Sequence, residues 1–389
     1  MKLLTRELAQ KIVERTMGII NRNINVMNEK GIIIGSGDSS RINQVHDGAV
    51  AVIERGDIVE IDDEEAQFLK GAKPGVNLPI YFKNEIVGVV GITGKPEEVR
   101  GFGLLIKMAA EMILEQAFLM EQIQWDERLK EEILHQLITG EITSDPWFKE
   151  RAKTLGIDLD VPRVAVILEL RSNSLTEEAL SKKRKKIISI LKTLIEPDDL
   201  LTLTYTTEII LLKKIRLKDM DWDKDQLFHQ LNAWKFRLNH STNVKMKIGI
   251  GTYYQDFKGL FQSYDEAKKT LKVGLTLYPD QDIYWYHDMG FPILIQQISA
   301  LNNHPLLDHY KKIVSRDKKG ELQQTLKAFI EENGEINKTA ERLFIHRNTL
   351  HYRLDKIKEI TGKDPKKLNE LIELYTSMLI YILRNNIVQ

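Results

Sequence analysis

The stretch GEINKTAERLFIHRNTLHYRLDKIKEITG, residues 334–362, decides how this chain is interpreted. In its second half Leu350, Leu354 and Ile357 recur at i, i+4 and i+7. This spacing places the three side chains on one face of a helix, where they pack against a core. The other face is crowded with polar and basic residues. The stretch therefore predicts a helix with a buried apolar stripe and a chemically rich exposed side.

The ends of the two predicted helices have suitable residues. Asn337 is expected to cap the first helix, because its side-chain oxygen can accept from free backbone N–H groups. Phe344-Ile345-His346 is short enough to form the turn, and Gly362 can end the second helix. Two short helices joined by a tight turn are the helix-turn-helix arrangement.

The start of the second helix has the side chains that bind DNA. A recognition helix presents its N-terminal residues to base edges, where Arg347 can pair with guanine and Asn348 with adenine. Four cations, Lys338, Arg342, Arg353 and Lys356, can hold phosphates. The remaining predicted DNA-binding residues are Thr339, His346, Thr349, His351 and Tyr352. The competing interpretation is an ordinary helical hairpin with a solvated polar face.

The segment from Leu326 to Gly362, with TAERLFIHRNTLHYRLDKI at its centre, closely resembles the C-terminal helix-turn-helix of PucR/CdaR-type bacterial regulators. This resemblance implies DNA binding, so the rest of the chain is interpreted as what controls that binding.

Composition limits the other possibilities. The 389 residues predict two or three domains, and the lack of cysteine fits a cytoplasmic protein without disulfides. No signal peptide or membrane span is expected. The net charge is zero, but it is distributed unevenly: residues 1–135 sum to −6, residues 136–304 to +2 and residues 305–389 to +4. Because the basic excess at the DNA-binding end is small, binding as a dimer or higher homo-oligomer to two-fold operator DNA is expected.

The pattern of residues 1–138 predicts an α+β sensor of the PAS or Cache type. A hairpin of strands 24–28 and 31–38 follows an opening helix, and a helix is expected from Ser40 to Glu54. A strand at 57–61, a short helix and a second hairpin turning at Lys83-Asn84 come next. A helix at about 97–138 closes the module and is expected to mediate dimerisation; the alternative is a long packed helix.

Residues 145–290 alternate strand-like and helix-like patterns, which predicts an α/β domain. IGIGTYYQDFKGLFQSYDEAKKTL resembles the degenerate GGDEF-like domain of the same regulators, and Tyr205-Thr206-Thr207-Glu208 stands where a GGDEF loop belongs. Cyclase chemistry needs metal-binding carboxylates and a nucleotide loop, and neither is evident, so this domain is interpreted as a spacer and association module. The basic run Lys182–Lys186 is interpreted as a solvated helix face, with a second DNA contact as the alternative. Residues 305–389 are expected to form an all-α DNA-binding domain.

Strings in the first module, among them GIIIGSGD, RINQVHDGA, PGVNLPI and VGVVGITG, resemble the sugar-diacid recognition domain of the carbohydrate diacid regulator family. Members activate genes for glucarate, galactarate and glycerate use, which implies such an effector here. Arg41 and His46 would share the helix after GSGD, and the loop Lys73–Pro79 adds amide and cationic donors. The predicted ligand-binding residues are Ser36, Arg41, His46, Lys73, Gly75, Val76, Asn77 and Thr93.

Each of these residues also has a structural explanation. Arg41 can pair with Asp38 or Asp47, His46 can be an ordinary core histidine, and Gly75 can belong to a turn. With no catalytic triad, phosphate-binding loop or metal motif, no cofactor or enzymatic activity is expected. The sequence predicts an effector-responsive transcriptional activator, whose effector changes operator affinity or contact with RNA polymerase. The alternatives are a PucR-like regulator for another metabolite, such as a purine-catabolism intermediate, and a non-catalytic interaction protein.

Overall fold

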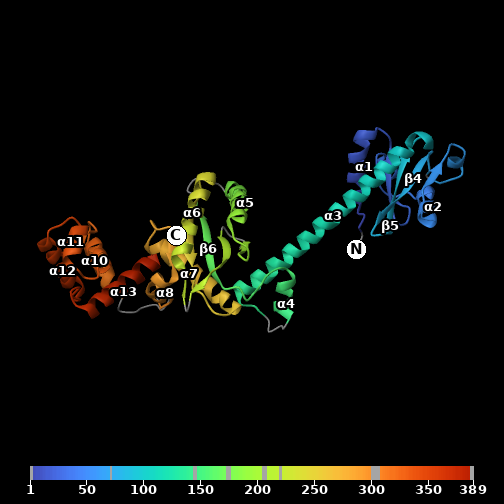
Figure 1. Cartoon of the computed structure of the whole chain (residues 1–389). Helices are drawn as coiled ribbons and strands as arrows, with labels where there is room; N and C mark the ends of the chain where they lie inside the picture. The colour runs from blue at the N-terminus through green and yellow to red at the C-terminus, as the bar shows by residue number, and fades with distance from the viewer. Residues whose placement is uncertain are drawn as a thin grey trace. The chain divides into compact units, whose positions relative to one another are not determined.

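The computed structural model describes residues 3–70, 72–142, 147–171, 177–203, 208–218, 221–298 and 307–385. The chain divides into two compact units, Met1–Leu129 and Lys130–Gln389, and each is described by itself (Figure 1). No helix in the described residues is both long and apolar enough to cross a membrane.

A five-stranded antiparallel sheet in the order β2-β1-β5-β4-β3 is the centre of the first unit. The elements of this unit are α1 (Arg6–Ile20), β1 (Ile24–Asn28), β2 (Ile33–Ser36), the 3-10 turn η1 (Ser39–Arg41), α2 (Asp47–Arg55), β3 (Val59–Ile61), the 3-10 turn η2 (Glu65–Gln67), β4 (Gly75–Phe82), β5 (Glu85–Thr93) and the start of α3 (Pro96–Thr139). The β4–β5 hairpin turns at Lys83 and Asn84, both with positive φ, as a tight hairpin turn requires.

The two faces of this sheet carry different side chains, because alternate residues of a strand point to opposite sides. On one face Val26, Leu78, Val90 and their neighbours pack against α1 and α3. On the other face Met27 and Val89 pack against α2. Only part of this second face is apolar, and the polar remainder is described below.

The helix expected from Ser40 to Glu54 is confirmed only from Asp47, where α2 begins, and is wrong before that residue. Asn43 has a φ of 73°, and Val45 forms an isolated bridge with Ile32, so the chain turns back between η1 and α2. Asparagine tolerates this left-handed conformation, which interrupts a helix. Arg41 therefore ends η1 and His46 is the N-cap of α2; the two residues do not share a helix.

The second unit contains a five-stranded sheet, in the order β12-β11-β6-β8-β7, with helices on both faces. Its strands are β6 (Arg163–Arg171), β7 (Leu200–Leu203), β8 (Glu208–Lys214), β11 (Lys245–Ile250) and β12 (Ile283–Trp285), with a separate pair β9 (Leu217–Lys218) and β10 (Asp221–Trp222). The turn at 205–207, expected in place of a GGDEF loop, lies outside the described residues.

The helices of the second unit form the covering layers and the C-terminal bundle. They are α4 (Trp147–Thr154), α5 (Glu177–Leu194), α6 (Lys224–Thr242), the 3-10 turn η3 (Phe257–Gly259), α7 (Leu260–Leu277), α8 (Tyr286–Ile298), α9 (Leu307–Arg316), α10 (Glu321–Glu331), α11 (Ile336–Arg342), α12 (Arg347–Thr361) and α13 (Leu368–Asn385). Helices α5 and α6 pack on one face of the sheet, while α7 packs on the other.

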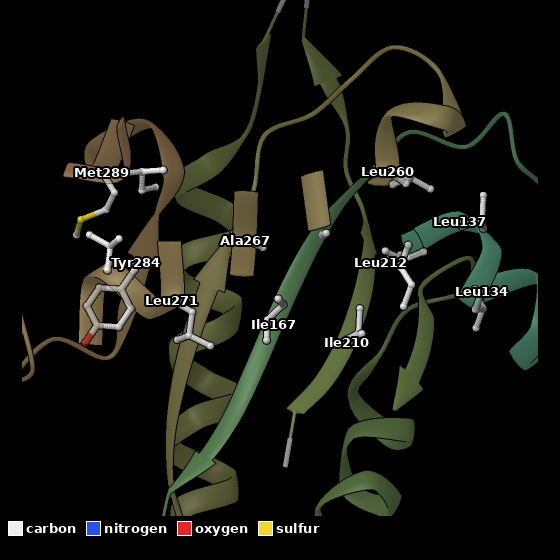
Figure 2. Close-up of a cluster of buried hydrophobic side chains, with 14 of the residues drawn as sticks. Leu134, Leu137, Ile167, Ile210, Leu212, Leu260, Ala267, Leu271, Tyr284 and Met289 are labelled. Atoms are coloured by element: carbon white, nitrogen blue, oxygen red, sulfur yellow. The ribbon is translucent and has the colours of Figure 1, made fainter. Parts of the chain in front are cut away.

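The core under α7 contains side chains of both α3 and α13, and we call it the shared core. The last turns of α3 contribute Leu134 and Leu137, which lie at one side of this core, with Tyr284 and Met289 at the other (Figure 2). Helix α13 contributes Leu379, Ile380 and Leu383 to the same core.

Helix α13 also completes the core of the helix-turn-helix, through Leu374 and Met378. Tyr375 belongs to both cores and stacks on Phe291 of α8, with ring centres 5.6 Å apart. One helix thus closes two cores. The middle and C-terminal parts of the chain, expected as separate modules, pack together in one compact unit.

Candidate functional site

The helix-turn-helix is formed by α11, a turn and α12. Leu350, Leu354 and Ile357 are fully buried against α10 and α13, as their spacing predicted. Phe344 in the turn has a φ of 54°, and His346 caps α12 by accepting from the Asn348 N–H at Nδ1, 3.3 Å away. Gly362 ends the helix in the left-handed conformation. The expected N-cap of α11 is wrong: Glu335 holds that position, and Asn337 lies inside the first turn.

One group of predicted DNA-binding residues lies together at the exposed N-terminal end of α12. Arg347 is tied to α11, since its Nη1 donates to Asn337 Oδ1 over 3.0 Å. The exposed residues are His346, Arg347, Asn348, Thr349, His351 and Tyr352, and we call them the recognition face.

The other predicted contacts differ in how they are engaged. Lys338 pairs with Glu335 and Lys356 with Glu359, both on the surface, while Arg342 pairs with Glu331 and Glu332. All three cations therefore have an acidic partner within the unit. Such surface pairs are weak and can exchange for phosphates.

Two of the predicted contacts are corrected by burial. Thr339 is fully buried, and its hydroxyl donates to the Glu335 carbonyl, so it faces the core of the bundle. Arg353 is mostly covered and pairs with Glu321 of α10 over 3.1 Å. It therefore joins two helices. Which face of each helix is buried depends on where α10 packs, and the local sequence did not indicate this.

The basic run Lys182–Lys186 lies on α5, whose Ile187 and Leu191 are buried against the sheet. Lys186 donates to the Ser241 carbonyl at the end of α6 over 3.1 Å. A cation at a helix C-terminus satisfies the free carbonyls there.

In the first unit, a row of polar side chains crosses the sheet on the face that α2 partly covers. Strand register aligns Ser36 with Asn25, Asn25 with Gly91, and Gly91 with Asn77. Ser36, Asn25 and Asn77 are all buried, and Ser36 Oγ donates to Asn25 Oδ1 over 2.6 Å. We call these four residues the polar row.

Glycines allow close packing around the middle of the polar row. A Cβ at Gly91 would stand 2.7 Å from Asn77 Oδ1, and one at Gly48 would stand 2.9 Å from Asn77 Nδ2 and 3.1 Å from His46 Cε1. The Asn77 amide and the His46 ring therefore lie around the same glycine, at the start of α2.

His46 is buried, and its Nδ1 has no hydrogen-bond partner among the described residues. Burial, and secondarily the nearby charge of Arg41, lowers the pKa of His46 to about 4. The imidazole is consequently neutral at physiological pH and can both donate and accept.

Arg41 places a positive charge close to these groups. It is buried, and burial lowers its pKa, although the nearby Asp38 carboxylate opposes that shift. Asp38 caps η1 through Ser40, and its pKa is lowered mainly by the Ser40 hydrogen bonds, with smaller contributions from Lys73 and Arg41. The loop after β2 and the loop before β4 are therefore close enough to interact electrostatically.

The remaining predicted ligand-binding residues separate into two groups. Gly75 pairs with Thr93 on the same face as Asn77 and Gly91, two residues along β4 and β5. Lys73 precedes β4 and is exposed. Val76 is a correction: it is fully buried and packs on the opposite face, toward α1 and α3, because it alternates with Gly75 and Asn77. Gly48 and Gly91 were not predicted.

Comparison with known proteins gives three matches to family models. Residues 4–137 match a model described as putative sugar diacid recognition, residues 139–273 a GGDEF-like domain, and residues 322–380 the PucR C-terminal helix-turn-helix domain. The order of sensor, middle domain and DNA-binding domain defines a helix-turn-helix regulator of transcription.

Two relatives match along nearly the whole chain, and a third matches about three quarters of it. The carbohydrate diacid regulator of Escherichia coli is 37% identical over 96% of this chain and 97% of its own length. An uncharacterized protein of Haemophilus influenzae is 33% identical over 97% and 99%. The purine catabolism regulatory protein of Bacillus subtilis is 23% identical over 74% of this chain and 56% of its own length. The chain belongs to the carbohydrate diacid regulator family.

Proposed function

We propose that this regulator binds a small sugar acid in its first unit and thereby activates genes for the use of that acid, such as glycerate, glucarate or galactarate. The observation that carries the proposal is the buried polar row beside Arg41 and His46, on the sheet face against which α2 packs. Buried polar groups require hydrogen-bond partners, and a hydroxyl group of a ligand would supply one to His46 Nδ1, which has none among the described residues.

The chemistry of the proposed site fits an acid with hydroxyl groups. The Arg41 guanidinium is suited to a carboxylate, since charge-assisted pairs with arginine are strong and geometrically specific. The amides of Asn25 and Asn77, the Ser36 hydroxyl and the neutral His46 can bind hydroxyl groups as donors or acceptors.

The number of buried cations favours a particular class within these acids. Arg41 is buried, whereas Lys73 is exposed at the edge. One carboxylate can be paired in the interior, while a second one has to reach the exposed Lys73 or remain in water. This supports a monocarboxylic hydroxy acid such as glycerate above a dicarboxylic one.

For DNA, we propose that the recognition face enters the major groove, with Arg347 and Asn348 at base edges and Lys338, Arg342 and Lys356 at phosphates. The modest positive charge of residues 305–389, +4, supports binding as a homodimer on a two-fold operator. We also propose that the DNA-bound protein contacts RNA polymerase. We propose no enzymatic activity for this chain.

We also propose the division into a sensor at 1–138, a GGDEF-like domain at 145–290 and a DNA-binding domain at 305–389. The antiparallel sheet, with helices between its hairpins, supports a PAS- or Cache-like plan for the sensor.

The test is a titration of the full chain with D-glycerate, D-glucarate and galactarate by calorimetry, with and without operator DNA. The effects of two ligands on each other's binding are reciprocal. If the acid changes the affinity of the protein for operator DNA by some factor, DNA must change the affinity of the protein for the acid by the same factor. If none of the three acids binds, the sugar-acid assignment is overturned. Binding of uric acid in the same assay would favour the alternative of a purine-catabolism regulator.

A further inference from the structure

Helix α3 presents an apolar face that nothing in its own unit covers. Leu105, Met108, Met112, Leu119 and Ile123 are each between 54% and 62% exposed, and we call them the exposed stripe. The opposite face of the helix packs on the sheet of its own unit through Val99, Ile106, Ala110 and Leu114. At 3.6 residues per turn the two faces are roughly 160° apart.

The spacing of the exposed stripe keeps it on one side over a long distance. Met108 and Leu119 are eleven residues apart, as are Met112 and Ile123. Eleven residues is almost a whole number of helical turns, so the stripe runs nearly parallel to the axis for about 27 Å. Scattered exposed apolar residues are normal, but a continuous apolar surface marks an interface.

We propose that the exposed stripe packs against the same stripe of a second copy of this chain, with the two α3 helices parallel and in register. A face that meets its own copy makes a self-complementary, two-fold contact. This deepens the proposed dimeric regulator and rests on that proposal for its purpose, but the contact itself is argued from α3 alone.

Charge beside the stripe decides the orientation. Between residues 102 and 123, the acidic side chains Glu111 and Glu115 lie along one edge of the stripe. Glu111 pairs with Lys107 over 3.8 Å and accepts from the Tyr81 N–H, whereas Glu115 has no ion pair among the described residues, so Glu115 supplies the net charge of this edge. The other edge is uncharged and consists of Phe102, Ala109, Gln116 and Met120.

A parallel pair brings the edge of one helix against the opposite edge of its partner, whereas an antiparallel pair brings like edges together. In this chain the parallel pair places each acidic edge on an uncharged one. The antiparallel pair places Glu115 near the acidic edge of the other copy, and like charges at an interface oppose association.

The chain lacks cysteine, so a single introduced cysteine reports one position without background. Leu105→Cys and Ile123→Cys lie near the two ends of the stripe. In a parallel pair in register each meets its own copy, and each variant alone should form a disulfide-linked dimer of the full chain under mild oxidation. Trp125→Cys is the control: Trp125 is 61% exposed on the same helix but lies well away from the stripe.

Each result decides the question. Efficient cross-linking of both stripe variants, with little for Trp125→Cys, supports the parallel contact. Cross-linking only when Leu105→Cys and Ile123→Cys are mixed means an antiparallel pair and overturns the orientation. A monomeric mass by light scattering, or equal cross-linking of all three variants, overturns the contact itself. None of these results depends on effector or operator binding, so failure here is distinguishable from failure of the proposed function.

Discussion

Arg347 Nη1 donates to Asn337 Oδ1 over 3.0 Å, which ties the first residue of α12 to the helix that precedes the turn. Both side chains are exposed, at the end of the bundle where the recognition face lies. The bond holds the guanidinium in one direction before DNA arrives. Because less side-chain freedom is then lost on binding, Asn337 is expected to support base recognition without touching a base.

Arg347→Ala should weaken binding to a DNA site selected by the wild-type protein by roughly 1–3 kcal/mol, the value of a bidentate contact to a base. Asn337→Ala should cost less, about 0.5–1.5 kcal/mol, because only the positioning hydrogen bond is lost. Lys358→Ala is the matched control: it removes a cation from α12 that pairs with Asp364 near the other end of the helix. Equal losses for Arg347→Ala and Lys358→Ala, measured by fluorescence anisotropy, would indicate nonspecific charge and not base recognition.

Gly91→Ala should reduce effector affinity about tenfold, the equivalent of one hydrogen bond, while leaving the protein folded. The added Cβ would stand 2.7 Å from Asn77 Oδ1, so the amide must turn away. Gly18→Ala is the control, because a Cβ there meets nothing within 4 Å. Calorimetry with D-glycerate measures both variants, and an unchanged affinity for Gly91→Ala would exclude Asn77 from the site.

His46 should make the first unit less stable in acid. Its pKa is about 4 in the folded chain and near 6.5 when unfolded, so between these values the unfolded state binds more protons. The stability that neutral His46 contributes to the folded state is fully present above pH 6.5 and is lost as the pH falls toward 4. At pH 4 this loss of unfolding free energy reaches about 3 kcal/mol. Hydrogen exchange in α2 at several pH values measures this loss.

His46→Gln cannot titrate and provides the reference for that experiment. Subtracting its pH profile removes the contribution of carboxylates that protonate in the same range. If the two profiles are parallel from pH 7 to pH 4.5, His46 is not held neutral by burial.

Leu137→Ala should speed amide hydrogen exchange in α13, although Leu137 and α13 lie far apart in the sequence. Leu137 is fully buried in the shared core, and truncating such a residue costs about 2–5 kcal/mol. Amides around Leu379 and Leu383 should exchange faster, while those of α5 and α6, on the other face of the sheet, change less. Leu104→Ala on the same helix is exposed and should change neither. Unaltered exchange in α13 would mean that the shared core does not couple the two helices.

The sequence predicted those parts of the fold that depend on neighbouring residues. Leu350, Leu354 and Ile357 are buried because one helix turn sets their spacing, and Lys83-Asn84 turns a hairpin because it joins adjacent strands. The first part of the helix expected from Ser40 to Glu54 was wrong because the bridge from Val45 to Ile32 is a contact with a residue distant from that segment in the sequence.

The same distinction explains the candidate sites. Arg41, His46 and Asn77 were found from motif strings, but Asn25 and Gly91 join them only through the register of β1 and β5, which lie far apart in the chain. Val76 was included with its neighbours although strand alternation turns it to the other face. Thr339 and Arg353 were predicted to contact DNA, but both are mostly buried. Their burial depends on the position of α10, which the sequences of α11 and α12 do not determine.

Helix α13 has a consequence for how regulators of this kind exchange parts. A hybrid that joins residues 305–389 to a foreign sensor would leave Leu379, Ile380 and Leu383 facing water, because their partners belong to the middle domain. A cut near residue 130 keeps those partners together, since the chain from Lys130 onward is one compact unit. The cassette that recombination can move intact is therefore the middle domain with its DNA-binding end, and new input specificities are most easily acquired by replacing what precedes it.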